Sequence, residues 1–162
     1  MRFSLSMLLL LLCTAGFSQF SPDTTQGLVI KKERLWIGRA QTVIVYDQTL
    51  TVMNNGEKSH LVVITCGEET GFINPYELKS VVTAMKWMGG YNDSLGGNSQ
   101  ELKIVLDNHL EIGTFWSDAT GKWGYYIDFN TSFSSHTKFI SRDTFLELIP
   151  IFDKADSILN AK

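Results

Sequence analysis

A strand-to-helix junction that occurs twice in the chain constrains the fold more than any other feature. The first junction is Phe72–Asn74 and the second is Phe139–Ser141. In each, an apolar pair precedes a good helix N-cap, and apolar residues then recur at helical spacing. These residues are Leu78, Val81 and Val82 after the first junction, and Phe145, Leu148 and Ile149 after the second, each matched pair being 67 residues apart. The spacing predicts an internal duplication; a chance likeness between two such junctions is the alternative.

Strand-like segments precede both junctions. They alternate apolar and polar residues, are rich in β-branched and aromatic side chains, and are separated by turn residues. In the first half they are Leu28–Ile37, Thr42–Val52, Leu61–Thr65 and Gly71–Ile73, and in the second half Leu102–Leu106, Leu110–Trp116, Trp123–Phe129 and Thr137–Ile140. We therefore expect an α+β fold, a mainly antiparallel sheet with two helices, built from a duplicated unit of four strands and a helix.

The first helix has the clearest local signals. Asn74 is expected as its N-cap, Pro75 suits the first helical position, and Glu77 completes a capping box. One apolar stripe follows, formed by Leu78, Val81, Val82, Met85 and Met88. Ser141 is the expected cap of the final helix. Both helices should bury one face against the sheet.

A stretch rich in glycine and asparagine, residues 89–99, separates the halves 27–89 and 100–160. It follows a helix and lacks the Gly-Lys-Ser/Thr ending of a phosphate-binding loop, so we interpret it as a linker. Residues 19–162 are then expected to form a single α+β domain.

The N-terminus has the layout of a signal peptide. A positive start at Arg2 precedes the apolar run Leu5–Leu12, and small or polar residues follow up to Ser18. The run is too short for a bilayer-spanning helix, which needs about 20 apolar residues. Cleavage after Ser18 would leave Gln19 as the new N-terminus and place the protein in the periplasm or outside the cell. Lipidation at Cys13 is the rival, but Leu12 is a poor match to the small residue that precedes a lipobox cysteine.

Composition narrows the possible partners. Removal of residues 1–18 leaves 144 residues with 13 basic and 17 acidic side chains, a net charge of −4. Mild acidity argues against a dedicated nucleic-acid binder. No later segment is apolar enough to span a membrane, so we do not expect an integral membrane protein. Cys66 is the single cysteine left, which excludes an intramolecular disulfide.

Aromatic residues gather in the expected hairpin from Phe115 to Tyr126. One strand face carries Trp123, Tyr125, Ile127 and Phe129, which we assign to the core. Phe115 and Tyr126 fall on the opposite face. With Trp116 they are the candidate ligand-binding residues, because flat rings beside polar turns can stack on a ligand.

No catalytic, metal or cofactor motif is present. The sequence lacks His-Glu-x-x-His, Cys-x-x-Cys and Gly-x-Ser-x-Gly patterns. We therefore assign no catalytic residue, no metal ligand and no cofactor. An exported hydrolase remains the alternative, and it would require two or more of four scattered side chains to converge on one pocket: Asp107, His109, Asp118 and Asp128.

Two resemblances accompany these patterns. The order of two units of four antiparallel strands plus a helix resembles the Whirly and PUR single-stranded nucleic-acid-binding proteins. That likeness implies their fold; their function requires a basic, aromatic sheet face, which an acidic exported chain does not favour. The chain also resembles small exported bacterial proteins of uncharacterised function. The likeness lies in the end of the signal peptide before Gln19, the helix start Phe72–Leu78 and the closing segment Phe145–Ile149.

The combined prediction is a secreted or periplasmic, non-catalytic binding or interaction module. Its partner would be a protein or a small ligand of the cell envelope. A small exported enzyme is the first alternative and a single-stranded nucleic-acid binder the second.

Overall fold

The computed structural model describes residues 30–90, 100–129 and 136–161. The predicted signal peptide and most of the predicted linker lie outside these residues. The chain divides into two compact units. In the smaller one, the described residues of Thr51–Glu57 form a turn in which the N–H of Val52 donates to the carbonyl of Glu57 at 2.8 Å. The larger unit comprises Lys32–Leu50 and Lys58–Lys162, and it holds both helices.

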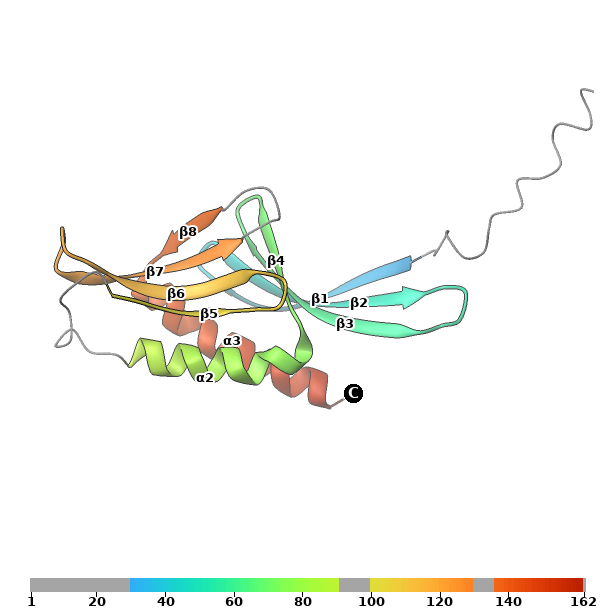
Figure 1. The fold of residues 1–162 in the computed structure, drawn as a ribbon. Helices are drawn as coiled ribbons and strands as arrows, with labels where there is room; N and C mark the ends of the chain where they lie inside the picture. Colours follow the sequence, from blue (N-terminus) through green and yellow to red (C-terminus); the bar gives the residue numbers. More distant parts are fainter. Residues whose placement is uncertain (1–29, 91–99, 130–135, 162) are drawn as a thin grey trace, which may run out of the picture. The chain divides into compact units, whose positions relative to one another are not determined.

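Two antiparallel four-stranded sheets and two helices make up the described chain, which confirms the α+β class (Figure 1). Each sheet is a meander of consecutive strands. Sheet A contains β1 (Ile30–Ala40), β2 (Val43–Val52), β3 (Lys58–Cys66) and β4 (Glu69–Ile73), and sheet B contains β5 (Glu101–Val105), β6 (Leu110–Ser117), β7 (Lys122–Phe129) and β8 (Thr137–Ile140). One helix follows each sheet, an order that agrees with the expected duplication.

The helices begin where the capping signals predict. A single 3₁₀ turn, η1 (Pro75–Glu77), leads into α2 (Leu78–Gly89), and the Glu77 carboxylate accepts the backbone N–H of Asn74 at 3.0 Å. Helix α3 (Arg142–Asn160) starts after Ser141, whose hydroxyl accepts the N–H of Thr144 at 3.1 Å. All five residues of the predicted stripe on α2 are buried. None of the helices in the described residues is long and apolar enough to cross a membrane.

One continuous core joins the two halves within the larger unit. Helices α2 and α3 pack against each other and against sheet B, and β4 of sheet A contacts β6 and β7. Tyr125 of β7 packs on Phe145 of α3 with ring centroids 4.7 Å apart. The predicted core face of β7 is confirmed, because Trp123, Tyr125, Ile127 and Phe129 are all buried. Cys66 is a buried free thiol.

Polar contacts also connect the halves. Glu77, which is 8% exposed, accepts the backbone N–H of Asp107 through its second carboxylate oxygen at 2.8 Å. Glu69 of β4 lies 3.3 Å from His136 and 3.4 Å from Lys138 at β8. The start of α2 and the edge of sheet A are thereby held to the second half.

Candidate functional site on the outer face of sheet B

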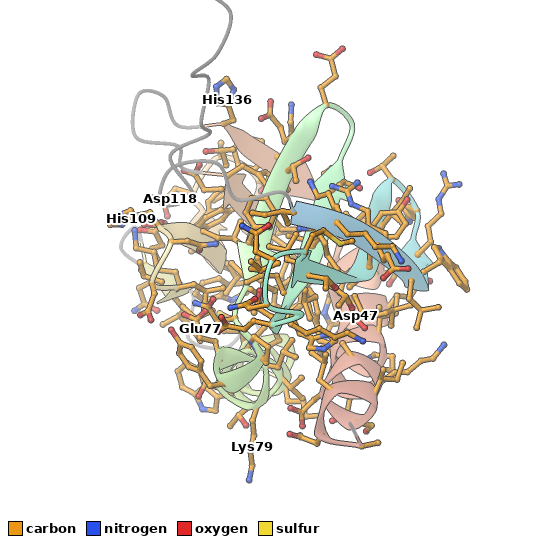
Figure 2. All side chains as sticks on the ribbon, turned by 90° about the vertical axis from the view of Figure 1, so that its right-hand side faces the viewer. Asp47, Glu77, Lys79, His109, Asp118 and His136 are labelled. Atoms are coloured by element: carbon orange, nitrogen blue, oxygen red, sulfur yellow. The ribbon has the colours of Figure 1, made fainter. Side chains whose placement is uncertain are left out.

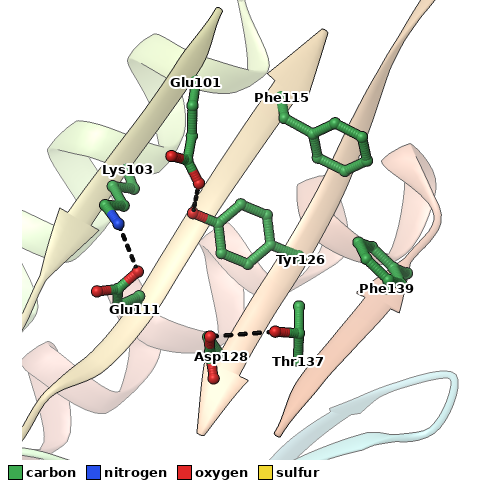
Figure 3. A pocket seen from close by; sticks show the side chains of 8 residues that line it. All are labelled: Glu101, Lys103, Glu111, Phe115, Tyr126, Asp128, Thr137 and Phe139. Carbon is green, nitrogen blue, oxygen red and sulfur yellow. Dashed lines mark hydrogen bonds and ion pairs between the residues drawn. The ribbon is translucent and has the colours of Figure 1, made fainter. Parts of the chain in front are cut away.

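The outer face of sheet B is the face turned away from the core residues Ile112 and Ile127. Strand residues alternate between faces, so every second residue of β5 to β8 contributes to it. Eight of them line a hollow of about 340 Å³ (Figure 3). They are Glu101 and Lys103 of β5, Glu111 and Phe115 of β6, Tyr126 and Asp128 of β7, and Thr137 and Phe139 of β8. This set is hereafter called the sheet-B hollow.

Two glycines shape the floor of the sheet-B hollow. Gly113 lies opposite Tyr126 in the β6–β7 register, and a Cβ atom on it would come within 2.7 Å of the Tyr126 ring. Gly124 lies opposite Phe115, and a Cβ atom there would come within 2.6 Å of the Phe115 ring. Each ring therefore lies across the glycine of the neighbouring strand, in space that any side chain would fill.

The rings form a row that crosses three strands. The Phe115 ring centroid is 6.3 Å from that of Tyr126 and 5.7 Å from that of Phe139, the latter pair meeting edge to face. Tyr126 is buried, with 5% of its surface exposed, whereas Phe139 is 71% exposed. The row thus ends in an aromatic side chain that is open to solvent.

The polar side chains of the sheet-B hollow are paired with one another. The Tyr126 hydroxyl donates to Glu101 at 2.5 Å, the Lys103 ammonium lies 2.8 Å from Glu111, and the Thr137 hydroxyl donates to Asp128 at 3.1 Å. Burial and then the bond to Glu101 raise the pKa of Tyr126 well above its ordinary value. The hydrogen bond to Glu111 raises the pKa of Lys103.

The structure places the three predicted ligand-binding residues on two faces. Phe115 and Tyr126 come together in the sheet-B hollow, although Tyr126 is more covered than a surface contact requires. Trp116 lies on the opposite face, where its ring meets that of Trp123 at 5.8 Å, edge to face. It packs against the core because adjacent strand residues point to opposite sides.

The three aspartates and one histidine considered for catalysis do not come together in the sheet-B hollow. Asp128 lines it, whereas Asp107 accepts a hydrogen bond from Tyr76, near the start of α2. His109 and Asp118 are exposed in the turns at opposite ends of β6. Figure 2 shows other titratable groups, His136, Asp47 and Lys79, in three separate parts of the protein. No group of three or more metal-binding side chains occurs in the described ranges.

A Thr–His–Asp cluster in sheet A also lacks catalytic geometry. Nδ1 of His60 lies 3.3 Å from the buried carboxylate of Asp47 and 3.2 Å from the Thr49 hydroxyl. A relay of the serine-protease type needs the hydroxyl and the carboxylate on different ring nitrogens. Here both partners share one nitrogen, so the cluster links β2 to β3 without activating a nucleophile.

Five residues of the sheet-B hollow were not singled out from the sequence: Glu101, Lys103, Glu111, Thr137 and Phe139. Asp128 was considered only for the alternative of an exported hydrolase. The two strand glycines were a sequence signal for the outer face of sheet B. An isolated glycine inside a strand pattern indicates a close approach, and Gly113 and Gly124 interrupt β6 and β7. The strand register was needed to show that each glycine faces an aromatic ring.

No protein-family model matches this chain, and searches of curated proteins and of solved structures find no significant match either. The resemblance to the Whirly and PUR proteins therefore remains one of element order. The sheet-B hollow gives it no functional support, since its lining has three carboxylates and one ammonium group. A phosphate backbone requires the opposite balance.

The glycine beneath Phe115 gives a first prediction. Gly124→Ala should lower the free energy of unfolding by about 1–3 kcal/mol, because the new methyl group must displace the ring. Gly90→Ala is the matched control: a Cβ atom there would meet nothing closer than 3.4 Å, so the change should stay within about 0.5 kcal/mol. Chemical denaturation measures both. Equal effects of the two substitutions would show that the ring does not occupy this space.

Tyr126 gives a pH-dependent prediction. Its pKa in the folded state lies above the ordinary value of 10.0, so its contribution to stability is complete below pH 10 and is lost as the pH rises further. The free energy of unfolding of the wild type should therefore fall more steeply above pH 10 than that of Tyr126→Phe. Ultraviolet absorbance should also show one late-ionising tyrosine missing in Tyr126→Phe. If the alkaline absorbance titrations of the wild type and of Tyr126→Phe coincide after scaling for the number of tyrosines, the Tyr126 hydroxyl is not buried and hydrogen-bonded.

Proposed function

We propose that this protein is an exported, non-catalytic binding module that acts in the periplasm or outside the cell and recognises its partner through the sheet-B hollow. The order of charge, apolar run and small residues before Gln19 supports export. The partner is a protein or small ligand of the cell envelope.

The observation that carries the binding role is the aromatic row laid over two strand glycines. Tyr126 and Phe115 are fixed by Gly113 and Gly124, and they support an exposed ring at Phe139. A row of this kind offers a preformed stacking surface, which loses little conformational entropy when a ligand binds. The hollow is also within the usual size range of small-ligand sites, roughly 300–1,000 Å³.

The chemistry of the lining favours binding over catalysis. Its eight residues include no His, Cys or Ser, the side chains that most often form a nucleophile and its base. Each carboxylate instead has a partner within the hollow: Glu101 has Tyr126, Glu111 has Lys103, and Asp128 has Thr137. These contacts fix acceptor positions around the rings, as a recognition surface requires.

Binding through this face can be tested with two exposed aromatic residues. Envelope extract is passed over immobilised mature wild type, Phe139→Ala and Trp87→Ala, and retained small molecules and proteins are identified by mass spectrometry. Trp87 is 58% exposed on α2, outside the sheet-B hollow, and serves as the control. A partner held by the wild type and by Trp87→Ala should be lost with Phe139→Ala. Equal retention by all three would remove the hollow from the binding surface.

Export has a separate test. Expressed in a Gram-negative bacterium with its N-terminus intact, the chain should be recovered from the periplasm or medium with an intact mass that corresponds to residues 19–162. Recovery of the full-length chain from the cytosol would contradict export. A mass that includes an acylated Cys13 would replace plain cleavage by lipidation.

A further inference from the structure

Strand β1 is an edge of sheet A. Within the described residues, the strand order β1-β2-β3-β4 leaves one long side of β1 without a partner strand (Figure 1). Such an edge presents backbone N–H and C=O groups to any chain that runs alongside it. Every residue of Lys32–Trp36 is exposed, so both faces of this part of the strand are open as well. The segment Lys32–Trp36 is hereafter called the β1 edge.

Helix α3 meets the strand directly after the β1 edge. The Lys154 ammonium donates to the carbonyl of Ile37 at 2.9 Å, and a Cβ atom on Gly38 would come within 3.0 Å of Ile151. The same ammonium lies 5.9 Å from the centre of the Trp36 ring. The helix therefore anchors β1 where the exposed segment ends, and it brings a cation to that end.

The β1 edge carries two exposed apolar side chains. Leu35 is 54% exposed and Trp36 is 59% exposed. Because consecutive strand residues point to opposite faces, each face of the strand has one of them. A chain added to the edge would cover both with its own alternate side chains. In strand addition, contacts of this kind give specificity to an interaction whose affinity comes from backbone hydrogen bonds.

The strand is also basic, in an acidic protein. Lys32–Ala40 contains three basic side chains and one acidic side chain, a net charge of +2, whereas residues 19–162 have a net charge of −4. Arg34 is oriented by its Nε, which donates to Gln48 at 3.0 Å, and by the Tyr46 ring, whose centre lies 5.7 Å from the guanidinium carbon. Neither Lys32 nor Arg34 contacts a carboxylate among the residues that the structure describes. Both cations can therefore pair with acidic groups of a partner.

We propose that the β1 edge binds an extended, acidic segment of a partner protein, which pairs with β1 as an added strand of sheet A. The inference is independent of the sheet-B hollow and concerns a second surface. The backbone of the added strand continues the hydrogen-bond ladder, and its acidic side chains lie beside Lys32 and Arg34. Opposite charges on directly opposed strand residues stabilise such a pair, whereas like charges destabilise it.

Other occupants fit the β1 edge less well. Pairing of β1 with β1 of a second copy would place Lys32 and Arg34 of one chain beside the same cations of the other, and basic side chains on an edge strand discourage this pairing. A nucleic acid would bring phosphates to the cations, but its backbone has no N–H groups with which to continue the ladder. An acidic peptide satisfies the charges and the backbone together.

The test uses a short blocked peptide in which glutamate alternates with threonine. It is titrated into the mature protein at low salt while the amide resonances of Lys32–Trp36 are followed by NMR. The peptide should shift these resonances and, at saturation, slow hydrogen exchange of the outward-facing amides at least about fivefold. It should also bind at least about fivefold more tightly than the same peptide with glutamine in place of glutamate, and added salt should remove this difference.

Variants separate the charge from the apolar contact. Lys32→Glu should weaken binding of the glutamate peptide about three- to tenfold at low salt and leave the glutamine peptide unchanged. Lys122→Glu is the matched control, because it makes the same charge change at an exposed lysine of sheet B, and its affinity should stay within about twofold of the wild type. Leu35→Gln should weaken both peptides, since it removes an apolar contact and no charge.

Four results would overturn the inference. Equal binding of the two peptides, or equal effects of Lys32→Glu and Lys122→Glu, would remove the charge complementarity. Slow exchange at the β1 edge that increases with protein concentration, without any peptide, would assign the edge to a second copy. Tighter binding of an oligodeoxythymidylate of the same charge would assign it to a nucleic acid. Resonance shifts that are absent from the β1 edge, whether absent altogether or confined to Phe115 and Phe139, would reject this surface as the peptide site.

Discussion

Close contacts at glycine positions hold this fold together and also build its outer surface. A Cβ atom on Gly71 of β4 would come within 2.7 Å of Leu110 in sheet B, and one on Gly89 of α2 would come within 2.6 Å of Leu146 on α3. The sheets and helices approach one another where these glycines leave room. Gly113 and Gly124 provide the same room on the outside of sheet B, where rings of the chain itself occupy it. Because the rings pack this closely against the glycine backbone, the course of the strands fixes where the rings lie.

The helices and the sheet order could be predicted because their signals are local. The cap at Asn74, the acid at Glu77 and the stripe from Leu78 to Met88 require only helical periodicity, and the structure confirms each of them. The core face of β7 followed equally from alternation. These inferences need no knowledge of which strand lies beside which.

The hollow could not be predicted in this way because it depends on register. Phe115 faces Gly124, and Tyr126 faces Gly113, only because the β6–β7 turn brings Ser117 opposite Lys122. Phe139 and Thr137 belong to β8, and the sequence between β7 and β8 does not predict the register in which these two strands pair. Trp116 was grouped with Phe115 by sequence proximity, whereas alternation sends the two rings to opposite faces. Pairwise strand geometry is therefore the missing information, and it decides which aromatic residues meet.

The central claim is that the rings of Tyr126 and Phe115 lie directly over Gly113 and Gly124 and so create a preformed binding face. Proton NMR of the mature protein tests it most directly. The account predicts ring-current upfield shifts for the α protons of both glycines, with nuclear Overhauser effects from Gly113 to the Tyr126 ring and from Gly124 to the Phe115 ring. Glycine α protons at their ordinary shifts, without Overhauser effects to either ring, would contradict it.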